Sequence, residues 1–314
     1  MVLSIELTDT RAYVVEAAGM GQPLQIRRQL TVNLPEDAVS QGLVTDVEAV
    51  AGALSAALKK AGITARSAMM CASSPAIMLR ETEAPWGADA QIRQALRAGM
   101  DEALRERQDL LLDYVVLERN GETCRAMLFV MPKALVEGYR AVLARCNLKP
   151  LGLEVSANAA FKLVHHCPNL CGPGAVILAK VDAGEVQMCL VDGDSRFFSR
   201  SVSISAQMGQ ANEFILSSLR TLPEVEDLST QDDVLRTVSE NLSRLAQYQN
   251  IRNSARPVAR VWLASSLPDP ERLALRLEDA TGLPTSVLGL CEGVAGQAAS
   301  IGRYVYAVGA LLRK

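Results

Sequence analysis

Histidine and aromatic residues are scarce in this chain of 314 residues. The two histidines are neighbours, His165 and His166, and aromatic residues make up 4% of the sequence. A hydrolase with a serine or cysteine nucleophile and a histidine base would have to use one of these two, and the chain has no Gly-x-Ser-x-Gly motif. A basic stripe interleaved with aromatic residues is typical of nucleic-acid binding, and the chain has none. We therefore expect neither such a hydrolase nor a nucleic-acid partner.

Long apolar runs are missing as well. No run reaches the roughly 18 residues that a membrane-spanning helix needs, and the first residues do not have the pattern of a signal peptide. Seven scattered cysteines, an odd number, are typical of free thiols in a reducing compartment. A net charge of -3 with 49% hydrophobic and 21% charged residues is ordinary for a globular protein. We expect a cytoplasmic protein without direct membrane insertion, long enough for two domains.

Three consecutive strands are predicted at the start of the chain and again near its middle. The breaks in the second set are Asp182-Ala183-Gly184 and Asp192-Gly193-Asp194, and Asp-Gly between apolar runs is typical of a hairpin turn. The predicted strands are 2–7, 12–17 and 24–34 in the first set and 175–181, 185–191 and 196–204 in the second. This recurrence indicates a duplicated architecture.

Helices and strands alternate after each predicted meander. The expected helices are 47–61, 88–107, 133–146, 157–166, 206–222, 231–251, 269–281 and 295–312. The expected strands are 66–72, 77–82, 111–118, 123–130, 148–155, 258–264 and 285–288. Three meander strands followed by alternating helices and strands are the ribonuclease-H-like arrangement, and two such domains in tandem are the plan of the actin, Hsp70 and sugar-kinase group. We therefore predict an α/β protein with an actin-like fold.

Six stretches carry a more specific resemblance. They are QGLVTD at 41–46, PWG at 85–87, LEVSANAAF at 153–161, FFSR at 197–200, ENLSRLAQY at 240–248 and YAVGALLR at 306–313. In order and spacing they resemble the PilM family of actin-like proteins of type IV pilus assembly and, more distantly, FtsA, over essentially the whole chain.

The resemblance implies a division of the chain into two ribonuclease-H-like domains. The first would consist of residues 1–76, 151–168 and 297–314. An FtsA/PilM-type subdomain for partner binding would be inserted at 77–150. The second domain would span 169–296 and include a helical subdomain at 206–255.

In this family ATP lies between the two domains, against two strand–turn–strand hairpins. Each hairpin uses glycine so that backbone N–H groups can approach the phosphates, and an aspartate to hold Mg²⁺. Where the first loop of the family has G-x-D-x-G, this chain has Ser4-Ile5-Glu6-Leu7-Thr8. In the second loop, the aspartate and glycine fall either at Ala179 and Val181 or at Asp182 and Gly184. The adenosine turn, expected as Gly-Gly, is Ser265-Ser266.

These departures predict a degenerate nucleotide site without ATP turnover. We expect no catalytic residue and no metal ligand in it, although hydroxyl groups could still contact the phosphates of ATP with Mg²⁺ in an altered pose. The residues concerned are Glu6, Thr8, Thr10, Asp182, Gly184, Ser265 and Ser266. The interpretation that we favour for Glu6, Thr8 and Ser265 is that they are turn residues of a fold kept as a scaffold.

The resemblance also implies a partner. In the PilM family a groove near the insert and the first domain takes the extended N-terminal tail of PilN, so we expect a PilN-like membrane protein to bind here and a pilus assembly ATPase to be a further partner. Trp86 is a candidate contact residue, or else packs locally. FtsA has an amphipathic membrane helix beyond the fold, whereas this chain stops at Lys314. We therefore expect attachment to the inner face of the cell membrane through partners.

Two functions follow from this interpretation. The first is a cytoplasmic scaffold of a type IV pilus or related secretion machine. The alternative is a functional actin-like ATPase whose ATP-dependent domain closure regulates pilus assembly, and an FtsA-like filament former is a third. A zinc site at His165-His166-Cys167-x3-Cys171 is the weakest hypothesis, because the spacing matches no standard pattern and Pro168 interrupts it.

Overall fold

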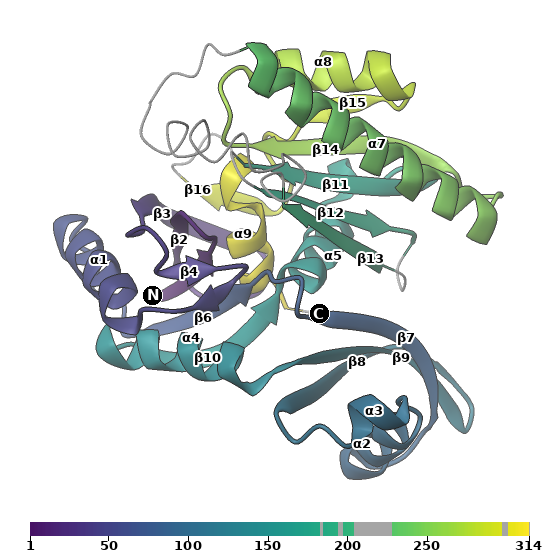
Figure 1. Ribbon diagram of the computed structural model, residues 1–314, viewed down its shortest axis with the longest axis horizontal. Coiled ribbons are helices and arrows are strands. Elements are labelled where there is room, and N and C mark those ends of the chain that lie inside the picture. The colour runs from purple at the N-terminus through teal and green to yellow at the C-terminus, as the bar shows by residue number, and fades with distance from the viewer. Residues whose placement is uncertain (183–184, 194–196, 204–227, 297–300, 314) are drawn as a thin grey trace.

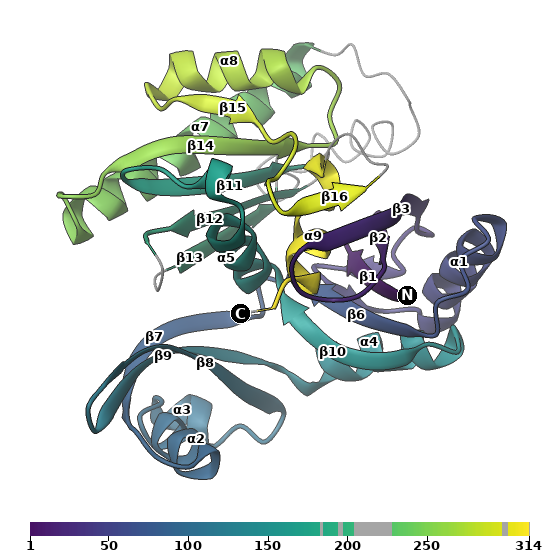
Figure 2. The same cartoon turned by 180° about the vertical axis from the view of Figure 1, so that it is seen from behind.

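The computed structural model describes residues 1–182, 185–193, 197–203, 228–296 and 301–313 (Figure 1). Two mixed sheets lie on either side of helices α5 (Ser156–His166) and α9 (Val305–Leu311), and a smaller sheet projects beside the first. The view from behind shows the same arrangement, with α7 (Leu228–Arg252) and α8 (Pro270–Thr281) on the outer side of the second sheet (Figure 2). The molecule thus has two lobes joined through a central pair of helices.

The first sheet has six strands in the order β10-β6-β1-β2-β3-β16. β1, β2 and β3 form an antiparallel meander, and β6 and β10 continue the sheet in parallel on the other side of β1. The strands are β1 (Val2–Leu7), β2 (Arg11–Ala17), β3 (Leu24–Asn33), β6 (Ser67–Ala72), β10 (Lys149–Val155) and β16 (Val294–Gly296). The first predicted meander is therefore present.

Two helices pack against each other beside this sheet, α1 (Val47–Lys60) and α4 (Lys133–Arg145). A short ribbon of β4 (Val39–Ser40) and β5 (Leu43–Val44) precedes α1. Asp46 caps α1, as predicted, because its side chain accepts a hydrogen bond of 2.9 Å from the N–H of Ala49.

The second sheet repeats the first in the order β13-β12-β11-β14-β15. Its strands are β11 (Ala175–Val181), β12 (Glu185–Val191), β13 (Phe197–Ser203), β14 (Val258–Ser265) and β15 (Thr285–Val287). The meander is again antiparallel, and β14 and β15 are parallel to β11. One face of β11 packs with apolar residues of α7 and α8 in a core of its own. The two halves of the chain thus share one strand order, which explains the recurrence seen in the sequence.

The small sheet consists of β7 (Met78–Pro85), β8 (Leu110–Asn120) and β9 (Thr123–Pro132) in the order β7-β9-β8. Successive side chains of β9 point to opposite faces of the strand and pack in two different apolar cores. Ala126 and Leu128 pack with Ile92 and Leu96 of α2 (Asp89–Ala98), whereas Met127 and Phe129 belong to the main core. The small sheet is thereby held between its own helices and the rest of the protein.

Two predicted helices differ from the structure. The single helix expected at 88–107 is wrong, because α2 ends at Gly99 and a separate short helix α3 (Glu102–Arg105) follows. Glycine has a low helix propensity, and here its N–H closes the last turn of α2 on the carbonyl of Ala95. The final helix expected at 295–312 is too long, because the structure has β16, a short 3-10 helix η3 (Gly302–Tyr304) and α9 instead.

The predicted domain boundaries can be compared with the sheets. Helix α4 contacts α1, and β10 begins at Lys149 in the first sheet, so 133–150 lie with the first sheet and not with the small one. β16 also pairs with β3 in the first sheet, although 169–296 was assigned to the second domain. The helix predicted at 206–222 lies outside the described residues. Of the expected helical subdomain 206–255, the structure describes α7, which packs directly on the second sheet.

Helices α5 and α9 pack unusually closely in the centre of the molecule. A Cβ atom added to Gly309 of α9 would overlap the carbonyl oxygen of Ala159 on α5. Lys162 of α5 adds a polar contact, because its Nζ forms an ion pair of 2.7 Å with Glu154 and donates a hydrogen bond of 2.7 Å to the carbonyl of Leu312. Glycine at 309 is thus required by the distance between the two helices.

We expect Gly309→Ala to lower the free energy of unfolding by about 1–3 kcal/mol, because the new methyl group has to push α9 away from α5. Gly52→Ala is the matched control, since no atom lies within 4 Å of a Cβ there and Gly52 is inside α1. The control should stabilise the protein by about 0.5–1 kcal/mol through helix propensity. Urea unfolding of both variants measures the difference, and equal effects would contradict the close packing.

Candidate functional site

The first strands of the two meanders end next to each other between the sheets. Glu6 is near the end of β1, and Lys180 is near the end of β11. The ammonium group of Lys180 donates a hydrogen bond to Oε1 of Glu6 and forms an ion pair with it. The side chains are 2% exposed for Lys180 and 0% for Glu6. A buried ion pair therefore connects the central strands of the two lobes.

Three further side chains surround the ammonium group of Lys180. Oδ2 of Asp182 lies 3.6 Å from Nζ, the ring centroid of Tyr13 on β2 lies 4.1 Å away, and that of Tyr306 on α9 lies 5.3 Å away. A cation over an aromatic face is attracted by the ring quadrupole, and more strongly when it is desolvated. These contacts offset the cost of burying the lysine charge.

Burial and charge together set the protonation of the pair. Desolvation raises the pKa of Glu6 to about 7, because it outweighs the attraction of Lys180 for the carboxylate. Burial alone would lower the pKa of Lys180, but the carboxylates of Glu6 and Asp182 raise it above its ordinary value. Lys180 is thus an ammonium ion at neutral pH, while Glu6 titrates close to neutrality.

The alternation of β11 decides which of its residues reach this site. Ala179 and Val181 lie in the core of the second lobe, whereas Lys180 points to Glu6. The sequence alternative that puts the aspartate at Ala179 therefore brings no carboxylate to the site. The other alternative brings Asp182 to it, and Gly184 lies outside the described residues.

The predicted hydroxyl residues are occupied by local hydrogen bonds. Thr8 donates to the carbonyl of Arg11 at 3.0 Å and accepts from its N–H at 3.1 Å, which closes the turn between β1 and β2. Ser265 donates to the carbonyl of Val181 at 3.0 Å and so ties the end of β14 to β11. Oγ of Ser266 is buried without a hydrogen-bond partner, and Thr10 is exposed. The structure thus brings Glu6 and Asp182 together and uses Thr8 and Ser265 as turn residues.

These residues do not fit a magnesium ion between the two strand ends. The ammonium group of Lys180 already lies against both carboxylates there, and a second cation would be repelled by it. In the loop 4–8, residues with side chains also occupy the positions where the family has glycine, which lets the backbone approach a phosphate. Within the described residues, no group of three histidine, cysteine or acidic side chains is arranged to hold a metal ion.

Gly42, from the stretch 41–46, lies over the turn that follows β1. Its backbone has a φ of +78°, and its N–H donates a hydrogen bond of 3.1 Å to Asp9. An added Cβ would overlap the carbonyl of Ser73. The glycine is therefore needed for a close contact within the protein, and the stretch positions the entry to α1.

Trp86 lies at the end of β7 and not at the central ion pair. Its ring is 39% exposed, and the guanidinium group of Arg119 lies 4.7 Å from the ring centroid. Its backbone N–H donates to the carbonyl of Glu122 at 2.8 Å. These contacts hold Trp86 against the β8–β9 turn, and its role in binding a partner stays a prediction.

Lys180, Tyr13 and Tyr306 are the site residues that the sequence did not indicate as such. A signal was present for Lys180, because it is the one charged residue in the apolar run 175–181. A lysine in a buried strand requires an acidic partner, and Glu6 occupies the matching place in the first apolar strand. The two tyrosines had no such signal, since only the packing of β2 and α9 brings their rings to the lysine.

Comparison with solved structures identifies the fold. A chain of the PilM-PilN type IV pilus biogenesis complex is 20% identical, with a TM-score of 0.79, and the match covers 99% of this chain and 97% of that one. EutJ, the ethanolamine utilization protein from Carboxydothermus hydrogenoformans, is 11% identical with a TM-score of 0.53, covering 99% and 88%. The chain therefore has the actin-like fold of PilM, and the predicted fold class is confirmed.

The likeness is one of structure and not of sequence. No protein-family model matches the chain, and no curated protein matches it by sequence. At 20% identity the solved structure establishes the fold alone. The chemistry of the site has to be argued from the residues themselves.

The buried ion pair should show strong coupling in a double-mutant cycle. At pH 8 we expect Lys180→Met to lower the free energy of unfolding by about 3–5 kcal/mol, because it leaves the buried carboxyl group of Glu6 without its partner. Adding Glu6→Gln should recover a large part of this loss, since the variant then has no unpaired charge. Arg145→Met is the control, because its ion pair with Glu48 is exposed and should contribute less than about 1 kcal/mol. Additive losses in the double variant would contradict the pairing.

Stability should also depend on pH through Glu6. Its pKa rises from 4.5 in the unfolded chain to about 7 in the folded protein, so the folded state binds the proton more tightly. The contribution of Glu6 is therefore fully present below pH 4.5 and is lost as the pH rises to about 7, a change of about 3 kcal/mol. Urea unfolding from pH 5 to pH 8 should show the stability difference between wild type and Glu6→Gln changing over this window. Parallel curves would contradict it.

Proposed function

We propose that the chain is a cytoplasmic actin-like scaffold of a type IV pilus or related secretion machine. It binds the extended N-terminal tail of a PilN-like membrane protein, and its nucleotide site is degenerate. The observation that carries this proposal is the full-length likeness to the PilM chain, which was solved in a complex with PilN. A pilus assembly ATPase is the further partner that this role implies.

The ion pair of Glu6 and Lys180 supports the loss of nucleotide chemistry. In the fold, the strand ends that carry these residues are the place where a nucleotide and its metal would join the two lobes. Here a lysine of the protein itself supplies the positive charge between the carboxylates of Glu6 and Asp182. The two lobes are thus connected by a contact within the protein, so a nucleotide is not needed to hold them together.

The edge of the first sheet supports the binding of an extended peptide. Among the described strands, β10 pairs with β6 alone and forms the border of this sheet toward the small sheet (Figures 1 and 2). Leu151 of β10 is 43% exposed, beside an irregularity in the pairing between Pro150 and Gly152. Proline and bulges discourage pairing at the start of the strand, and the N–H of Val155 donates to the side chain of Glu154, which leaves 153–154 for main-chain hydrogen bonds to a peptide.

The small sheet also exposes two large apolar side chains, Leu111 at the start of β8 and Met78 at the start of β7. Exposed apolar surface of this kind is typical of binding surfaces when it is contiguous. No helix among the described residues is long and apolar enough to span a membrane. In this proposal, the partner supplies the attachment to the inner face of the membrane.

The alternative is a functional actin-like ATPase whose domain closure regulates pilus assembly. Three polar atoms favour it, because Oε2 of Glu6, Oδ1 of Asp182 and Oγ of Ser266 are buried without hydrogen-bond partners. Unsatisfied buried groups are costly, and a bound ligand could satisfy them. The two functions differ in whether nucleotide changes partner binding.

A fluorescently labelled peptide from the cytoplasmic tail of a PilN-like protein should bind the purified chain in a polarisation titration. Leu151→Asp should weaken binding at least tenfold, because it places a charge on the apolar surface. Leu275→Asp is the matched control on α8, where Leu275 is 65% exposed and far from β10. Mg·ATP at millimolar concentration should leave the affinity for the peptide unchanged.

The same titrations separate the two functions. Calorimetric binding of Mg·ATP at micromolar concentration, with a change in peptide affinity, would establish the ATPase alternative. A ligand at a hundred times its Kd stabilises a protein by about 2.7 kcal/mol, so a thermal shift would also reveal it. Equal loss of peptide binding in Leu151→Asp and Leu275→Asp would argue against the surface at β10.

A further inference from the structure

Positively charged side chains gather where the strands of the first sheet begin. We call these residues the basic edge: Arg27, Arg28, Lys59, Lys60, Arg66 and Lys149. All six are exposed. They come from β3, the last turn of α1, the connection into β6 and the first residue of β10. A net charge of -3 for the whole chain makes this local excess of positive charge notable.

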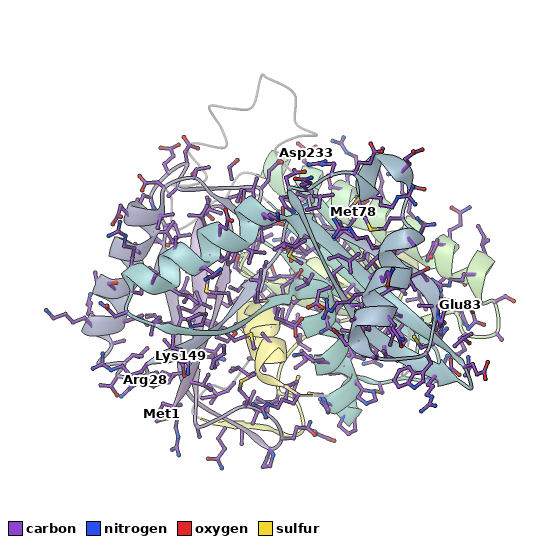
Figure 3. All side chains as sticks on the ribbon, turned by 90° about the horizontal axis from the view of Figure 1, so that it is seen from below. Met1, Arg28, Met78, Glu83, Lys149 and Asp233 are labelled. Carbon is purple, nitrogen blue, oxygen red and sulfur yellow. The ribbon has the colours of Figure 1, made fainter. Side chains whose placement is uncertain are left out.

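The pairing of the strands brings these residues to one side of the molecule. Ala17 pairs with both Val2 and Ile26, and Ser67 pairs with Lys149 in the same sheet. The N–H of Lys149 donates to the carbonyl of Arg66 at 2.8 Å. Figure 3 shows Arg28 and Lys149 on the side of the molecule where the chain starts. From β3 to β10 the row spans about 19 Å, at about 4.8 Å per strand.

Acidic residues are few near the basic edge. The segments 17–30, 57–70 and 143–151 contain no aspartate or glutamate. Arg28 is paired with Glu16 at 3.0 Å, and Arg145, which is also in the last segment, is paired with Glu48. Within the described part of the chain, no ion pair is formed by the other five residues of the basic edge. Five positive charges are therefore available to an anionic partner.

A cavity of about 340 Å³ opens between β3 and the end of α1. It is lined by 26–30 of β3 with Ala61 and Ile63, so that Arg27 and Arg28 lie beside apolar side chains. Nε2 of Gln29 is buried there without a hydrogen-bond partner. The guanidinium group of Arg28 is held by Glu16 and by the carbonyl of Gly62, whereas Arg27 has no ion pair with a described residue. Arg27 beside the unsatisfied donor of Gln29 is suited to a phosphate oxygen, because arginine and phosphate match in charge and geometry.

We propose that the basic edge, with this cavity, binds the phosphate headgroups of an anionic lipid surface. A row of exposed lysine and arginine side chains about 19 Å long is suited to several headgroups at once. RNA is less suited, because 17–30, 57–70 and 143–151 contain no aromatic residue on which bases could stack. This surface lies at the opposite end of β1 from Glu6, about 13 Å away along the strand.

This lipid contact goes beyond the proposed scaffold role and does not depend on peptide binding. A tail captured at β10 would bring the chain to the membrane, and the basic edge would determine which side faces the lipid. It contacts headgroups and inserts no helix. Each lysine or arginine near an anionic surface should strengthen binding about fivefold at moderate salt.

Vesicle flotation tests the proposal with the full chain and no peptide. The chain should float with vesicles of phosphatidylcholine and phosphatidylglycerol, and not with phosphatidylcholine alone. Arg27→Gln with Lys60→Gln should weaken this binding about 30-fold, because two charges are removed. Arg97→Gln with Arg105→Gln is the control, since it changes the net charge equally on α2 and α3. High salt should reduce binding of the wild type.

A second variant tests the cavity without changing the charge. Gln29→Leu should weaken binding about tenfold, because it removes the donor expected to reach a phosphate oxygen. Unchanged binding in this variant would overturn the role of the cavity. Equal flotation with both kinds of vesicle, equal losses in the two double variants, or binding of polyglutamate without vesicle binding would overturn the lipid surface itself. Failure of the peptide titration would leave this result unaffected.

Discussion

The arrangement of the two lobes depends most closely on the buried contact between Lys180 and Glu6. A lysine can be buried only when opposite charge or an aromatic face compensates for lost hydration. Here the compensation comes from β1, β2 and α9 for a lysine on β11. Separation of the lobes at this point would take Glu6 away from Lys180, so the pair links their relative position to the stability of the fold.

The duplicated strand order explains why the pair lies where it does. Each sheet starts with an antiparallel meander and continues with parallel strands on the other side of the first strand. β1 and β11 are therefore equivalent, and their ends meet between the lobes. Helices α5 and α9 bring the lobes close enough for this contact, because Gly309 lets their backbones approach. The ends of β1 and β11 thus make a contact within the protein.

The ion pair, the basic edge and β10 lie at different places on the first sheet. The ion pair lies at the end of β1, and the basic edge lies where the strands of the same sheet begin. β10 borders the sheet at its side and faces the small sheet (Figure 1). A peptide at this border and a lipid surface at the basic edge would not compete for the same residues. The two proposed surfaces are thus distinct from the contact between the lobes.

The sequence by itself determined the fold class and most of the elements. Local patterns were sufficient for the two meanders, for the cap at Asp46 and for the loss of glycine near Glu6, because each of these depends on neighbouring residues. They were insufficient for the break at Gly99, where helix propensity and tertiary contacts compete, and for β16, whose partner strand is distant in the chain.

Only the tertiary structure decided what the altered residues do. Glu6 in one apolar strand and Lys180 in another were visible in the sequence, but 174 positions separate them, and their pairing depends on how the lobes dock. The rings of Tyr13 and Tyr306 are brought to Lys180 by the same docking. The basic edge likewise combines charges from segments that are distant in the chain. Periodicity and spacing describe single elements, whereas charge compensation is a property of the packed molecule.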